Sequence, residues 1–108
     1  MKFSIDLGFR NESIEQIRSR VEAFMGATCE ERCSDYRGGD YLVCRNAGEE
    51  VKIQLNRDGD ELAEEEFPEH TVLVLFDPTT RDRDIEGAFL ANDNCALIRK
   101  REYPRESV

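Results

Sequence analysis

The sequence predicts an α+β fold, with a mainly antiparallel sheet of about five to six strands and one long helix packed on one face. The first observation is length, because 108 residues is the size of a single domain with one core. The second is composition, since 39% of the residues are hydrophobic, which suffices for a core although 36% are charged. The third is pattern, because short strand-like segments outnumber helical stripes. We therefore expect residues 1–108 to form one α+β domain.

The first strand and the long helix are predicted near the start of the chain. Residues 3–9 alternate between apolar and polar or small side chains, which is typical of a strand with one buried face. Apolar residues then recur at helical spacing between positions 14 and 25. Ser13 and Gln16 have the spacing of a capping box, and Gly26 suits the C-terminal end of a helix. This helix should lie on the sheet.

The middle of the chain is predicted to form three antiparallel strands with one solvent-facing side. They cover residues 29–36, 41–45 and 51–55, with turns at Gly38–Gly39 and Asn46–Gly48. The polar residues that alternate along the third strand, and that we expect on the solvent-facing side, are Lys52, Gln54 and Asn56.

A strand buried on both faces is predicted over Thr71–Phe76, because this run is almost continuously apolar and rich in β-branched residues. Asp77 and Pro78 are expected to end it. Residues 81–90 predict a short second helix, and residues 95–101 predict the last strand. The apolar residues of the second helix are Ile85, Ala88 and Phe89.

The chain is strongly acidic, and its charge is unevenly distributed. Its formal net charge is −9, and residues 55–108 contain seven basic and fourteen acidic residues. A negative field repels nucleic-acid backbones and anionic membranes and attracts basic proteins. We therefore expect no direct binding of nucleic acid or membrane. The first residues lack the continuous apolar run of a signal peptide, so we expect a cytoplasmic protein.

The sequence contains four cysteines, Cys29, Cys33, Cys44 and Cys95. In an oxidising compartment they would allow three disulfide pairings, but a cytoplasmic location favours reduced thiols. Three residues separate Cys29 from Cys33, whereas zinc-binding pairs usually have two residues between them on a tight turn. We expect reduced, mostly buried thiols, with no metal and no cofactor.

No catalytic motif is present, because the sequence lacks a phosphate-binding glycine loop, a nucleophile elbow and a helical zinc motif. His70 is the only histidine, which excludes a two-histidine metal motif. An enzyme is an alternative only if Cys44 and His70 meet in space as a nucleophile and its base. We assign no catalytic residue and do not expect an enzyme.

An acidic stretch between Asp58 and Glu69 contains seven acidic residues and no basic one. Its carboxylates either keep the protein soluble or form a docking surface for a basic partner around Phe67. The residues predicted to bind a partner are Asp58, Asp60, Glu61, Glu64, Glu65, Glu66, Phe67, Glu69, Asp82 and Asp84. Neutralising Glu64, Glu65 and Glu66 together is expected to slow association with the partner and to leave the fold intact.

In size, acidity and strand-first α+β pattern, the chain resembles the immunity proteins of bacterial toxin systems, including contact-dependent growth inhibition and nuclease bacteriocins. The resemblance is one of overall profile and covers the whole chain. It implies a protein, monomeric in our expectation, that binds a cognate toxin domain, often a basic nuclease, and neutralises it. Alternatives from other classes are a regulatory or structural subunit of a larger assembly, a small thiol-dependent enzyme using Cys44 and His70, and a mimic of DNA.

Overall fold

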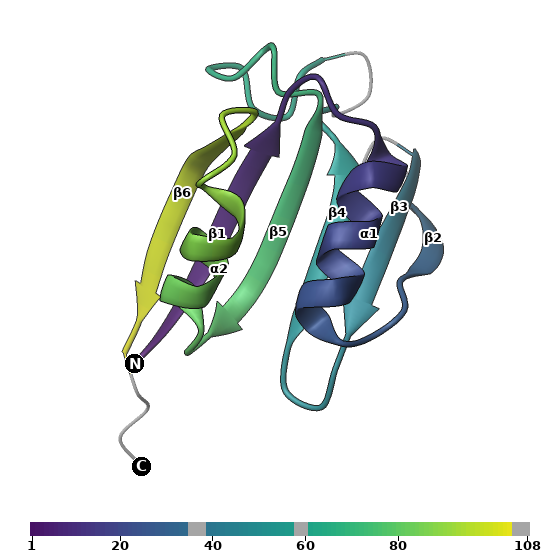
Figure 1. The fold of residues 1–108 in the computed structure, drawn as a ribbon. Helices are drawn as coiled ribbons and strands as arrows, with labels where there is room; N and C mark the ends of the chain where they lie inside the picture. The colour runs from purple at the N-terminus through teal and green to yellow at the C-terminus, as the bar shows by residue number, and fades with distance from the viewer. Residues whose placement is uncertain (35–38, 58–60, 105–108) are drawn as a thin grey trace.

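The computed structural model describes residues 1–34, 39–57 and 61–104, which form six strands and two helices (Figure 1). In chain order the elements are β1 (Lys2–Phe9), α1 (Ile14–Met25), β2 (Glu30–Ser34), β3 (Gly39–Arg45), β4 (Glu50–Leu55), β5 (Val72–Thr79), α2 (Asp82–Phe89) and β6 (Cys95–Tyr103). The strands form one sheet in the order β2-β3-β4-β5-β1-β6, and every neighbouring pair is antiparallel. The predicted α+β fold, with a long helix after the first strand and a short second helix, is confirmed.

The two helices are the connections that cross the sheet. Because β1 lies between β5 and β6, the chain passes from β1 to the far edge at β2 through α1, and from β5 past β1 to β6 through α2. Figure 1 shows both helices on the same face of the sheet, α1 over β3 and β4 and α2 over β1. We call this side the helical face and the other side the open face. The hydrophobic core lies between the helices and the helical face.

Strand β1 and helix α1 supply the centre of this core. Ile5, Leu7 and Phe9 of β1 are fully buried, as are Ile17 and Val21 of α1. Each such side chain stabilises the fold by about 1.5–3 kcal/mol relative to an exposed one. The aromatic rings of the core pack edge to face or tilted, with neighbouring centroids 5.5–6.2 Å apart, and they are Phe9, Phe24, Phe76 and Phe89. These rings join both helices to β1 and β5.

The ends of α1 follow the sequence signals. The Ser13 hydroxyl accepts a hydrogen bond from the Gln16 backbone N–H at 3.2 Å, and the Gln16 side chain accepts one from the Ser13 N–H at 2.9 Å. At the other end Gly26 adopts a left-handed conformation with φ of 65°, and its N–H bonds the Glu22 carbonyl at 2.9 Å. The capping box and the glycine stop predicted from the sequence are both confirmed.

Strand β5 is longer than predicted, because it continues through Asp77 and Pro78 to Thr79. The ladder with β1 shifts register here, with two β5 residues opposite the single residue Ser4, which makes a β-bulge. The ladder between β4 and β5 ends at Phe76, before Asp77 and Pro78. A proline costs no ladder hydrogen bond at such a bulge, so the expectation that Pro78 ends the strand is wrong.

Two smaller predictions also change. Ala88 is exposed, because the short helix α2 buries only Ile85 and Phe89. Gly39 begins β3 instead of forming a turn, while Gly38 lies outside the described residues.

The open face carries no helix among the described residues, but residues 61–71, which precede β5, fold back over one end of it. This end is the one at which β1 ends and β5 begins (top of Figure 1). Here His70 and Ile98 lie directly on the backbone of Gly8 in β1. A Cβ atom at Gly8 would lie 2.9 Å from the His70 Cβ and from the Ile98 Cδ1, so only glycine fits.

We predict that Gly8→Ala lowers the free energy of unfolding by about 1–3 kcal/mol. The added methyl group collides with the His70 Cβ, which is attached directly to the backbone and cannot rotate away. Urea denaturation measures the change. The control is Gly87→Ala in α2, where a Cβ has nothing within 4 Å, and we expect this variant to gain up to about 1 kcal/mol of stability. Equal behaviour of the two variants would contradict the close packing on Gly8.

Candidate functional site

A buried asparagine holds the connection from β4 to β5 in place. The side chain of Asn56, which is 1% exposed, donates from Nδ2 to the backbone carbonyls of Phe67 and His70, each at 3.0 Å, and of Glu64 at 3.3 Å. Its Oδ1 accepts from the Glu64 N–H at 2.7 Å, and its own backbone N–H bonds the Thr71 carbonyl at 2.9 Å. One amide therefore determines the path of residues 61–71, and we call residues 61–69 the acidic loop.

The sequence pattern placed Asn56 on the solvent-facing side of β4, and in this respect it is wrong. Gln54 and Asn56 are both buried, and the acidic loop folds back over Asn56. A buried amide with no partners costs several kcal/mol, whereas one with both its donor and acceptor groups bonded fixes the surrounding backbone. The alternation of a strand gives no indication of what a later loop will cover.

Four carboxylates of the acidic loop face solvent. Glu61, Glu65 and Glu66 are exposed, and no cation in the described part of the chain pairs with them. Glu69 is also exposed, with 77% of its side chain accessible and a distant contact of 3.7 Å to Arg10. These side chains are available to a partner without breaking a strong contact within the protein.

Two other members of the loop hold it to the sheet. Arg99 of β6 pairs with the Glu64 carboxylate through two hydrogen bonds of 3.1 and 3.2 Å, and it also donates to Asp6 of β1 at 2.9 Å. Burial raises the pKa of Asp6 in spite of this arginine. The ring of Phe67 packs edge to face on His70, with centroids 5.6 Å apart. Glu64 and Phe67 thus anchor the loop, although the sequence grouped them with the docking carboxylates.

The remaining predicted binding residues do not join this surface. Asp82 and Asp84 begin α2, at the opposite end of the sheet from the acidic loop, with the length of β5 between them (Figure 1). The ammonium group of Lys100 lies 2.9 Å from Asp82, and their hydrogen bond lowers the pKa of that carboxyl group. Asp58 and Asp60 lie outside the described residues.

The thiol and the imidazole considered for catalysis lie on opposite faces of the sheet. Cys44 belongs to the core on the helical face, whereas His70 covers Gly8 on the open face. Burial raises the pKa of the Cys44 thiol, and burial likewise raises the pKa of Cys29 and of Cys95 to about 12. Because Cys44 and His70 lie on opposite faces, and burial disfavours the thiolate form of Cys44, the structure does not assemble a Cys44–His70 pair.

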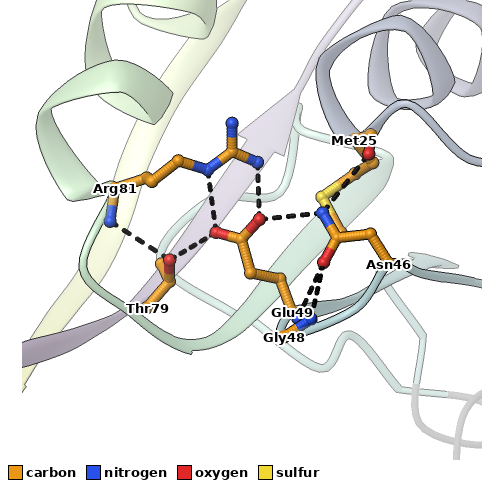
Figure 2. Close-up of polar contacts among 6 residues, drawn as sticks. All are labelled: Met25, Asn46, Gly48, Glu49, Thr79 and Arg81. Carbon is orange, nitrogen blue, oxygen red and sulfur yellow. Dashed lines mark hydrogen bonds and ion pairs between the residues drawn. The ribbon is translucent and has the colours of Figure 1, made fainter.

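A second polar cluster surrounds Glu49 in the turn from β3 to β4 (Figure 2). Arg81 binds both carboxylate oxygens of Glu49, at 2.6 and 2.9 Å. Thr79 donates its hydroxyl to Glu49 at 2.6 Å, and Asn46 donates its amide at 2.9 Å. These bonds, with that of Arg81 first, lower the pKa of Glu49 to about 2. A carboxylate held so strongly in its charged form is a poor general base at neutral pH.

The same cluster joins three parts of the chain. The Asn46 side chain accepts from the N–H groups of Gly48 and Glu49, at 3.1 and 2.8 Å, and donates to the Met25 carbonyl of α1 at 3.3 Å. The Arg81 guanidinium lies 4.4 Å from the centre of the Phe24 ring. A shallow hollow of about 320 Å³ lies beside the cluster. Because both carboxylate oxygens of Glu49 are already bonded within the protein, by Arg81, Thr79 and Asn46, we assign the cluster a structural role.

Comparisons with models of protein families, with curated proteins and with solved structures gave no significant match to this chain. Neither of the helices in the described residues combines the length and the apolar character that crossing a membrane requires. Over the same residues, no three side chains of the histidine, cysteine, aspartate or glutamate type gather as a metal site.

We predict that Asn56→Asp lowers the free energy of unfolding by about 2–4 kcal/mol, because a carboxylate faces three carbonyl oxygens where an amide donated. The matched control is Asn11→Asp, which makes the same change of charge at an exposed position and should cost less than about 0.5 kcal/mol. Hydrogen exchange should also show loss of protection, in the first variant alone, at the amides of Phe67 and His70, which bond the Glu64 and Phe67 carbonyls that the Asn56 Nδ2 group holds. Retained protection there would contradict the role of Asn56.

We predict that Glu49→Gln destabilises the protein by about 1–3 kcal/mol at pH 7 and that this difference disappears in acid. The pKa of Glu49 is about 2 in the folded protein and 4.5 ordinarily, so its charged form stabilises the fold above about pH 4.5. That contribution is lost as the pH falls from 4.5 towards 2. Urea unfolding of both proteins across this range tests the idea, with the exposed Glu65→Gln as control. A difference that does not depend on pH would contradict it.

Proposed function

We propose that the protein is a binding protein whose acidic loop docks on a basic protein partner. The observation that supports the proposal is that exposed carboxylates lie on a loop whose backbone is held in place. Glu61, Glu65 and Glu66 face solvent without an internal cation among the described residues, while Asn56 holds the loop that presents them. A loop that is already ordered loses little conformational entropy when it binds.

Ion pairing distinguishes Glu61, Glu65 and Glu66 from the acidic residues that are paired within the protein. Glu49, Glu64 and Asp82 are each within 3.2 Å of an arginine or lysine nitrogen of the same protein, so their fields are largely compensated. The fields of Glu61, Glu65 and Glu66 are not compensated in this way, on a chain whose net charge is −9. Such a surface speeds the encounter with a positive patch, and the rate falls as salt is added.

The partner we propose is a cognate toxin domain, most simply a basic nuclease, which the protein neutralises as a cytoplasmic immunity protein. A nuclease surface that binds nucleic acid is positively charged along the path of the phosphates. Carboxylates in a fixed array can occupy that path and exclude the substrate. The overall acidity and the small α+β fold support this assignment, and it requires no catalytic group in the protein.

We predict that Glu65→Gln with Glu66→Gln slows association with the partner roughly three- to ten-fold at low salt and flattens its salt dependence. The partner is first captured from the source cells on the tagged protein and identified by mass. Stopped-flow or surface-based kinetics then give the association rate. The dissociation rate should change less, because long-range attraction acts mainly on the encounter.

The matched control is Asp84→Asn with Glu102→Gln, which removes the same charge from two exposed carboxylates at the other end of the sheet. If this control slows association as much as the loop variant does, only net charge matters and the acidic loop is not the docking surface. Unchanged kinetics in the loop variant would contradict the proposal directly.

A further inference from the structure

A hollow of about 190 Å³ lies on the helical face, between the start of α1 and strands β2 to β4. The apolar residues that line it are Ile14, Leu42 and Ile53, and its acidic residues are Glu15, Glu31 and Asp40. We call it the α1 groove. It combines an apolar floor with a rim of carboxylates.

Strand register explains why these side chains gather. Glu31 of β2 stands opposite Leu42 of β3, and Leu42 stands opposite Ile53 of β4, so all three point to the helical face. Asp40 lies two residues before Leu42 in β3 and therefore shares its face. Helix α1 begins only at Ile14, so its first turn borders this end of the three strands without covering it.

The carboxylates of the α1 groove have no ion-pair partner in the part of the chain that the structure describes. Among the described residues, no arginine, lysine or histidine forms an ion pair with Glu15, Glu31 or Asp40, and no basic side chain lines the hollow. All three acidic residues are exposed, whereas Leu42 and Ile53 beneath them are buried. An apolar floor below unpaired negative charge suits a side chain that is itself apolar along its stem and positive at its end.

We propose that the α1 groove receives the side chain of an arginine from the basic partner. The methylene stem of the arginine would lie on Ile14, Leu42 and Ile53, and the guanidinium would reach the carboxylates of the rim. A planar guanidinium binds carboxylates through paired hydrogen bonds, which lysine cannot reproduce. This inference rests on the proposed function, because it identifies a second contact for the same partner.

The position of the groove supports a shared partner. β3 begins at the same end of the sheet as β5, and this is the end over which the acidic loop folds (Figure 1). The start of α1 lies there as well, directly after β1 ends. A partner that rests on this end of the sheet can place one arginine in the groove while its positive surface faces the loop.

The test uses Nα-acetyl-arginine amide as the probe and its citrulline analogue as the control, because citrulline has nearly the same shape without the charge. Titration of the isotope-labelled full chain is followed by NMR. We expect the arginine probe to give saturable shifts at Ile14, Leu42 and Ile53, with a Kd of about 1–10 mM for so small a ligand. The citrulline probe should give none.

The double variant Glu31→Gln with Asp40→Asn should weaken binding of the arginine probe at least five-fold, while Glu65→Gln with Glu66→Gln leaves it unchanged. A dispersed NMR spectrum shows that each variant is folded. Equal shifts from the two probes, shifts confined to other residues, or unaltered affinity in the groove variant would overturn the inference.

The two proposals fail separately. If the groove variant binds the captured partner as the parent protein does while the loop variant associates slowly, the loop docks the partner and the groove does not. If the loop variant associates at the parent rate while the groove variant no longer binds the arginine probe or the partner, the α1 groove is a binding site. In that case the proposal that the partner docks on the acidic loop is wrong.

Discussion

The buried amide of Asn56 is the interaction on which the open face of the protein depends. It bonds the backbone of the acidic loop at Glu64 and Phe67 and the backbone of His70 just after it, and this places His70 on Gly8 and Glu64 beside Arg99. A buried amide tolerates no loss of partners, so the loop is held in one conformation. The exposed carboxylates are therefore presented from a defined backbone, as a docking surface requires.

The acidic residues divide into those that stabilise the fold and those that remain available. Glu49 and Glu64 are bound by arginines that lie far away in the sequence. These ion pairs hold together elements that are not adjacent in the chain. Glu61, Glu65 and Glu66 make no such contact among the described residues. A high negative charge thus serves two physical purposes, and only the spatial partners of each carboxylate reveal which one applies.

Placing both helices on one face gives the two sides of the sheet different chemistry. The helical face contains the core, the thiols of Cys29 and Cys44 and the α1 groove, whereas the open face carries the ion pairs of Arg99 and the acidic loop. For this reason Cys44 and His70 lie apart, although the sequence left open that they could meet as a nucleophile and its base. The acidic loop and the α1 groove lie at the same end of the sheet, on opposite faces, and this end is where we propose that a partner binds.

The sequence by itself determined the local structure: the α+β class, the alternation of β1, the capping box at Ser13 and the stop at Gly26. Each depends on contacts within a few residues, which a linear pattern records. Only the tertiary structure decided that β1 lies between β5 and β6, that Pro78 falls at a bulge inside β5, and that Asn56 is buried. It also separated Asp82 from the acidic loop. These outcomes depend on contacts between segments far apart in the chain, whose free energies no local pattern contains.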